Sequence, residues 1–143
     1  MLIDTNVWLA LLLAHHPFHQ NAQQYVSQHT PLRLCTSVQI SLMRLLTTTS
    51  IQQQYGIGTL NNQAASAYLD QIRANPNVQV VAEPTEVYSL WIKLATDARP
   101  APKRWMDAHL AALALHHGWV IVTLDQGFAM YQKLGVQVHI IDG

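Results

Sequence analysis

Short apolar segments of strand character alternate with helical segments along the whole chain. The plainest strands are 78–81 and 119–123, rich in Val and Ile, and the clearest helices are 7–14 and 105–115, rich in Leu and Ala. A continuous apolar strand such as 119–123 is typical of a parallel sheet covered on both faces. The alternation therefore predicts an α/β fold, a three-layer α/β/α sandwich around a mainly parallel sheet of roughly five strands.

The remaining elements continue this alternation. The segment 47–58 is rich in Thr, Ser, Gln and Gly, which predicts a long polar loop. No repeat, linker or second core divides the chain, so we expect one domain over residues 1–143. Further strands are expected at 1–3, 34–36 and 136–141, and further helices at 18–28, 37–48, 63–74, 86–96 and 127–134.

The charge balance limits how this chain can bind nucleic acid. Eight Lys and Arg residues match eight Asp and Glu residues, so no overall positive field holds phosphates and any RNA or DNA contact must be local. Only 11% of residues are charged, which makes each carboxylate informative. Apolar surface not covered by charge favours self-association, and a homodimer is expected.

Cysteine usage and hydropathy bear on location. The single cysteine, Cys35, has no partner for an internal disulfide and forms no Cys-based zinc pattern, which suits a reducing cytoplasm. The apolar run 7–14 is too short to cross a bilayer. A cytoplasmic protein without membrane association is expected.

Three carboxylates are expected at one edge of the sheet. Asp4 follows the first strand, Asp125 follows strand 119–123, and Asp107 opens the helix that leads into that strand. Ligands of parallel sheets bind outside the carboxyl ends of the strands, so these side chains converge if the two strands are neighbours. Asp4 is also a good helix N-cap, and the two roles need not exclude each other.

The chemistry of this set points to a hard cation. Mg²⁺ and Mn²⁺ prefer oxygen ligands, and Mg²⁺ commonly takes one or two carboxylates together with waters and phosphate oxygens. A cation held in this way lowers the pKa of bound water and neutralises phosphate charge, so the implied reaction is phosphodiester hydrolysis.

Four segments together carry a resemblance to a known family. They are LIDTN at the start, CTSVQISLMRLLT, MDAHLAALAL and VIVTLDQGF, in this order along the chain. The sequence resembles PIN-domain ribonucleases, most closely the VapC type of toxin from bacterial toxin–antitoxin pairs. The resemblance implies an Mg²⁺- or Mn²⁺-dependent endoribonuclease, usually a homodimer, inhibited by an antitoxin whose tail enters the acidic cleft. The family's metal-binding carboxylates fall on Asp4, Asp107 and Asp125.

Two positions depart from the family pattern. Gln39 stands where the family usually has an acid in the third helix, and Gly127 stands where a second acid often follows the last Asp. Glu83 is not expected to substitute, because strand 78–81 should lie at the sheet edge away from Asp4. Fewer carboxylates should weaken the hold on a cation, with the Gln39 amide oxygen left as a neutral ligand or water-orienting group. A catalytically weakened module that binds RNA or protein therefore stays open as an alternative to the nuclease.

Supporting roles are expected for two further sets of residues. Thr5, Asn6 and Thr123 either orient metal ligands and waters or serve as caps and strand ends. Arg44, Lys103 and Arg104 are candidates for contacts to RNA phosphates. Core or dimer contacts are expected for the remaining notable side chains, which are Trp8, Trp91, Trp105 and Trp119, and a packing or surface role for His109.

Overall fold

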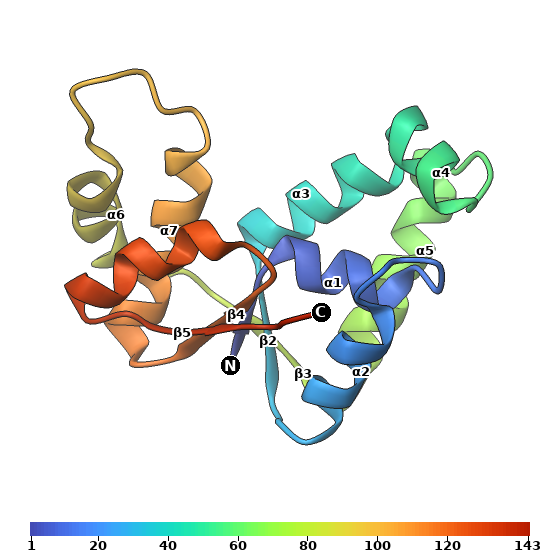
Figure 1. Cartoon of the computed structure of the whole chain (residues 1–143), viewed down its shortest axis with the longest axis horizontal. Coiled ribbons are helices and arrows are strands. Elements are labelled where there is room, and N and C mark those ends of the chain that lie inside the picture. Colours follow the sequence, from blue (N-terminus) through green and yellow to red (C-terminus); the bar gives the residue numbers. More distant parts are fainter.

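The computed structural model describes residues 1–143 and has a single five-stranded sheet (Figure 1). All neighbouring strands pair in parallel, in the order β3-β2-β1-β4-β5, which confirms the predicted α/β class and places β3 at an edge. The strands are β1 (Leu2–Ile3), β2 (Leu32–Cys35), β3 (Val78–Val81), β4 (Val120–Thr123) and β5 (Gln137–Ile140).

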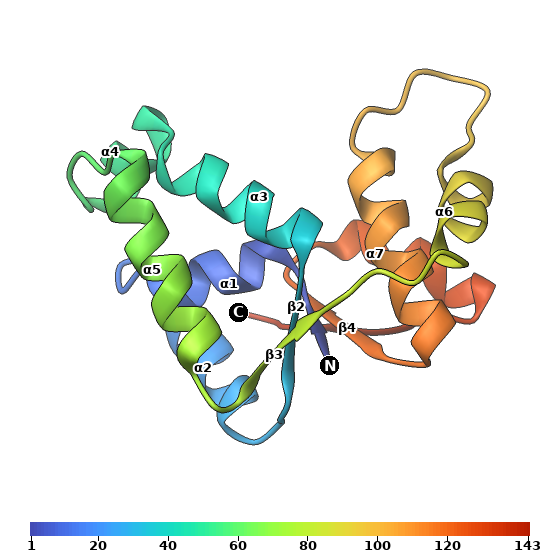
Figure 2. The same ribbon diagram turned by 180° about the vertical axis from the view of Figure 1, so that it is seen from behind.

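The helices form two groups on either side of the sheet. Helices α1 to α5 gather on one side, and α6, α7 and η1 gather on the other, as both views show (Figures 1 and 2). No helix combines the length and apolar character needed to cross a lipid bilayer. The helices are α1 (Thr5–Leu12), α2 (His19–Ser27), α3 (Thr36–Leu46), α4 (Thr49–Tyr55), α5 (Asn62–Ala74), α6 (Val87–Ala95), α7 (Arg104–His117) and the 3₁₀ helix η1 (Gln126–Leu134).

One hydrophobic core joins the sheet to both helical layers. The central strands supply fully buried Ile3 and Ile121, while α1 supplies Val7 and α7 supplies Leu113. Strands covered on both faces need apolar residues in succession rather than in alternation, which is the pattern of β1 and β4. The core thereby holds β1 and β4 rigidly, and it also fixes the positions of the residues that directly follow these strands.

The predicted polar loop at 47–58 is wrong, because it contains helix α4. Gln52 of this helix is buried, and its Nε2 donates hydrogen bonds to the carbonyl oxygens of Leu46 at 2.9 Å and Leu60 at 3.0 Å. The helix ends at Gly56, whose φ of 64° is left-handed and favours glycine. These tertiary hydrogen bonds, together with the packing of Ile51 and Tyr55 against the core, hold α4 in place, and a polar composition does not reveal them.

The order of the central strands brings the expected site together. Leu2 and Ile3 of β1 lie opposite Ile121 and Val122 of β4, so the two strands are neighbours as the site prediction requires. The backbone N–H of Asp4 donates to the carbonyl of Val122 at 3.0 Å. Residues after β1 and after β4 therefore leave the sheet side by side.

Candidate active site

Asp4, Asp107 and Asp125 line one cavity of about 430 Å³ at the carboxyl edge of the sheet. They come from the β1–α1 junction, the first turn of α7 and the β4–η1 junction. The fold of the sheet thus brings together the three carboxylates that were expected to converge. Along the chain, 103 positions separate Asp4 from Asp107 and 18 separate Asp107 from Asp125. The remaining wall of the cavity comes mainly from α1 and α3.

Asp4 is the most deeply buried of the three, with 7% of its surface exposed. Its Oδ1 accepts a hydrogen bond from the Thr5 backbone N–H at 2.7 Å, and its Oδ2 accepts one from Thr123 Oγ1, also at 2.7 Å. Burial raises the pKa of Asp4 to about 6; the two hydrogen bonds oppose this effect, and the charges of Asp107 and Asp125 add to it. Asp4 caps α1 and lines the cavity at once, so capping does not remove its side chain from the expected edge.

Thr123 and Asn6 tie the carboxylate loops together. Thr123 is fully buried, and besides donating to Asp4 its Oγ1 accepts from the Asp125 backbone N–H at 3.0 Å and from Asn6 Nδ2 at 3.3 Å. The Oδ1 of Asn6 accepts from the Leu124 N–H at 3.1 Å. This network fixes the start of α1 against the loop after β4, so the two side chains hold Asp4 and Asp125 in place.

The other two carboxylates are more accessible. Burial and the Asp125 charge raise the pKa of Asp107, while the charges of Lys103 and Arg104 act in the opposite direction. Asp125 caps η1, because its Oδ1 accepts from the Gly127 N–H at 2.8 Å. A Cβ at position 127 would lie 3.0 Å from that same oxygen, so any side chain there crowds Asp125.

The residues present suit an open divalent-cation site. No group of three His, Cys, Asp or Glu side chains, the three carboxylates included, forms a ready-made cage that could hold a metal ion. Mg²⁺ does not require such a cage, because waters and substrate phosphates complete its coordination. Two features fit a cation here: Asp4 is buried beside two other carboxylates, and Thr5 Oγ1, at the cavity wall, is buried without a hydrogen-bond partner. Carboxylate and hydroxyl oxygens are the donors that Mg²⁺ and Mn²⁺ prefer.

Gln39 does not lie where the sequence suggested. Its Oε1 accepts a hydrogen bond from Arg73 Nη1 of α5 at 2.9 Å, and it is not part of the cavity wall. The α3 residues that line the cavity are Ser41, Arg44 and Leu45, followed by Thr48 just after the helix, and their spacing of three and four places them on one face. Position 39 is displaced from position 41 by about 200° around a helix. The expected placement of Gln39 beside the carboxylates is wrong, and the same spacing rule would have identified Ser41.

Only two of the three basic residues expected to contact RNA phosphates lie at the acidic cavity. Arg44 and Lys103 line the acidic cavity. Arg104 instead forms an ion pair with Asp97, with 3.3 Å between its Nη1 and the carboxylate oxygen. Two of the three basic side chains, Arg44 and Lys103, therefore line the cavity, and the third, Arg104, is paired with Asp97.

Glu83 and the tryptophans complete the comparison with the sequence predictions. Glu83 follows the edge strand β3 and contacts His109, away from the three carboxylates, in agreement with the expectation that it does not replace an acid there. Trp8 is buried in the core, and Trp105 is 52% exposed, so for Trp105 only the dimer contact stays a prediction.

Comparison with known proteins identifies the family. The family model described as "PIN domain" matches residues 1–134. The chain belongs to the PIN-domain family. It is 37% identical over 148 residues to "Ribonuclease VapC41" of Mycobacterium tuberculosis, covering 99% of this chain and 98% of that relative. The family match and this relative confirm the resemblance to PIN-domain proteins of the VapC type that the four sequence segments indicated.

Solved structures share the fold at lower identity. VapC20 of Mycobacterium tuberculosis has a TM-score of 0.67 and 20% identity, covering 90% of this chain and 92% of that one. VapBC-1 of nontypeable Haemophilus influenzae has a TM-score of 0.66 and 18% identity, covering 97% and 96%. At this identity the likeness establishes the PIN architecture alone.

Proposed function

We propose that this chain is a divalent-cation-dependent endoribonuclease and the toxin of a type II toxin–antitoxin pair. The observation that carries the proposal is the meeting of Asp4, Asp107 and Asp125 in one cavity of a PIN domain. The relative that is 37% identical over almost its whole length is named a ribonuclease, which supports the same activity here.

Five side chains of the cavity have a part in this reaction. Asp4, Asp107 and Asp125 would hold Mg²⁺ or Mn²⁺. A divalent cation in such a site lowers the pKa of water and neutralises charge on the phosphate. Arg44 and Lys103, at the same cavity, attract the phosphates of the RNA backbone and supply locally the positive charge that the chain lacks overall.

An antitoxin protein is the partner that this function implies. Solved relatives include "VapBC2 from Rickettsia felis bound to a DNA fragment from their promoter", in which the PIN fold is similar at a TM-score of 0.64. By analogy we expect a cognate antitoxin that covers the acidic cavity. A homodimer and a cytoplasmic location remain predictions.

Cleavage of a structured RNA tests the proposal. The purified protein should cleave the RNA with Mn²⁺ or Mg²⁺, EDTA should stop cleavage, and Asp107→Asn should abolish it because a carboxylate facing the cavity is lost. Asp70→Asn is the matched control, since Asp70 is exposed on α5, outside the cavity. Cleavage retained by Asp107→Asn would contradict the assignment.

A module that binds RNA or protein without cutting is the second candidate. The observation that favours it is the absence of an acid on the α3 face of the cavity, where Ser41 lies instead. Calorimetry with Mn²⁺ separates the two functions. On the nuclease reading the wild type binds Mn²⁺, and Ser41→Glu binds it more tightly, while Gln39→Glu has no effect because that side chain lies away from the cavity. Absence of Mn²⁺ binding at millimolar concentration in the wild type would favour the binding module.

A further inference from the structure

A second cavity of about 410 Å³, bordered by α6 and α7, has an aromatic wall. Tyr88 and Trp105 are 63% and 52% exposed. Trp91 stands between them edge to face, with ring centroids 6.1 Å from Tyr88 and 6.0 Å from Trp105. The Nε1 of Trp91 donates to the Trp105 carbonyl at 2.8 Å, which fixes its ring. Two aromatic side chains are thus held on a rigid support with much of their surface open to solvent.

This aromatic cavity adjoins the acidic one. Met106 lines both cavities, and its neighbours in α7 are Trp105 on the aromatic side and Asp107 on the acidic side. Lys103, one turn earlier, lines the acidic cavity. A chain whose phosphate lies against Lys103 therefore has an aromatic recess within reach of an adjacent base.

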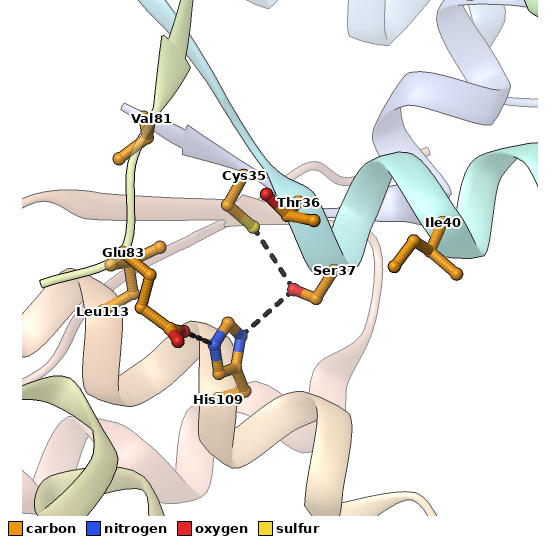
Figure 3. A pocket seen from close by; sticks show the side chains of 8 residues that line it. All are labelled: Cys35, Thr36, Ser37, Ile40, Val81, Glu83, His109 and Leu113. Carbon is orange, nitrogen blue, oxygen red and sulfur yellow. Dashed lines mark hydrogen bonds and ion pairs between the residues drawn. The ribbon is translucent and has the colours of Figure 1, made fainter. Parts of the chain in front are cut away.

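A polar wall completes the aromatic cavity. Figure 3 shows the His109 ring between Ser37 of α3 and Glu83, which follows β3. His109 Nδ1 lies 3.0 Å from Ser37 Oγ, and His109 Nε2 contacts Glu83 Oε1. When Nε2–H donates to the carboxylate, Nδ1 accepts the Ser37 hydroxyl proton. Cys35 Sγ also lies 3.4 Å from Ser37 Oγ and takes up part of its accepting capacity. With this tautomer the second carboxylate oxygen of Glu83 is the main acceptor left on the wall, and the His109 ring has no free N–H.

We propose that the aromatic cavity is a subsite for one unpaired RNA base that carries an amino group. Bases of single-stranded RNA stack on aromatic side chains and are read along their edges. Adenine, cytosine and guanine each present an amino group to acceptors, as cytosine does to a Glu carboxylate. Uracil has a single N3–H donor between two carbonyl oxygens, and these oxygens are disfavoured beside the acceptors of this wall. The subsite rests on the proposed action on RNA and adds base preference to it.

Binding of short RNAs without metal tests this subsite. The probes are fluorescein-labelled pentaadenylate, pentacytidylate and pentauridylate, titrated in EDTA and followed by anisotropy. The wild type should bind the first two several-fold more tightly than pentauridylate. Trp105→Ala should weaken binding of pentaadenylate about tenfold through lost stacking, and Trp105→Phe should keep most of the affinity. Leu134→Ala, at an equally exposed residue (52%) outside this cavity, is the control and should bind like the wild type.

A substitution of Glu83 tests the preference for bases that carry an amino group. Glu83→Gln should bring the affinity for pentauridylate closer to that for pentacytidylate, because the amide can donate to a uracil carbonyl. Circular dichroism verifies the fold of each variant, and Tyr88→Ala repeats the stacking test at a second exposed ring. Equal affinity of wild type, Trp105→Ala and Tyr88→Ala for pentaadenylate would overturn the subsite.

Two further results separate this proposal from its alternatives. If sedimentation shows a wild-type dimer that Trp105→Ala converts to a monomer, the aromatic wall is a subunit interface and the subsite is overturned. If the wild type fails to cleave RNA with Mn²⁺ yet loses pentaadenylate binding on Trp105→Ala, the nuclease proposal fails and the subsite stands. If the wild type cleaves RNA with Mn²⁺ while Trp105→Ala and Tyr88→Ala bind pentaadenylate as tightly as the wild type, the nuclease proposal stands and the subsite is overturned.

Discussion

The buried charge of Asp4 should make the metal-free protein less stable as the pH rises. Burial raises the pKa of this carboxyl from 3.8 to about 6 in the folded protein. The folded state therefore holds the proton more tightly than the unfolded chain does, and between these values it binds more protons. The stability contributed by neutral Asp4 is fully present below pH 3.8 and is lost as the pH rises through 6.

The size of this loss follows from the two pKa values. At about 1.36 kcal/mol for each pKa unit, ionisation of Asp4 costs about 3 kcal/mol of unfolding free energy at neutral pH. For a chain of this length that corresponds to a fall in Tm of about 6–12 °C. Asp4→Asn removes the cost, because an Asn side chain resembles a protonated Asp in offering one acceptor and one donor group.

Urea denaturation followed by circular dichroism in EDTA measures the effect. The unfolding free energy of Asp4→Asn minus that of the wild type should grow by about 2 kcal/mol from pH 4 to pH 7, because a small part of the difference is already present at pH 4. The difference for Asp70→Asn should stay level, since that carboxylate is exposed. Mn²⁺ at pH 7 should then stabilise the wild type more than Asp4→Asn, because a cation bound by the folded state alone shifts the equilibrium toward it. A difference between Asp4→Asn and wild type that does not change with pH would refute the reasoning.

Three more outcomes are expected. Thr123→Val should lower the unfolding free energy by about 1–3 kcal/mol in urea and raise the pKa of Asp4 further, because the hydroxyl that donates to this carboxylate is lost. Lys103→Ala should weaken RNA binding and reduce the slope of log affinity against log salt by about 1, while the exposed control Lys133→Ala leaves the slope unchanged. Gln52→Ala should destabilise the protein by about 1–3 kcal/mol and increase hydrogen exchange in α4, because two carbonyls lose their donor.

The fold and the convergence of the three carboxylates could be predicted from the sequence for a physical reason. Continuous apolar strands separated by helices leave few arrangements other than a covered parallel sheet, and residues that follow such strands share one edge. Asp4 and Asp125 follow the neighbouring strands β1 and β4, so their position depends only on strand order. Errors of one or two residues in the strand ends do not change that edge.

Helix orientation and tertiary hydrogen bonds were harder to predict. The face of α3 that meets the acidic cavity depends on how the helix packs, and an error of two positions exchanges Ser41 for Gln39. Helix α4 depends on the bonds of Gln52 to distant carbonyls, which a composition of Thr, Ser and Gln does not indicate. The link from His109 to Glu83 likewise joins elements that are far apart in the sequence.

The burial of Asp4 also bears on the choice between nuclease and binding module. Capping α1 does not require a charge, because Asn or Ser at the same position accepts a backbone hydrogen bond as well as Asp does. Asp4 nevertheless stands 7% exposed, beside two other carboxylates and with its pKa raised to about 6, at a cost in stability that an uncharged cap would avoid. A module that binds RNA by stacking and phosphate contacts gains nothing from this negative charge, which repels the backbone. A divalent cation offsets the cost by binding, so the arrangement favours the nuclease.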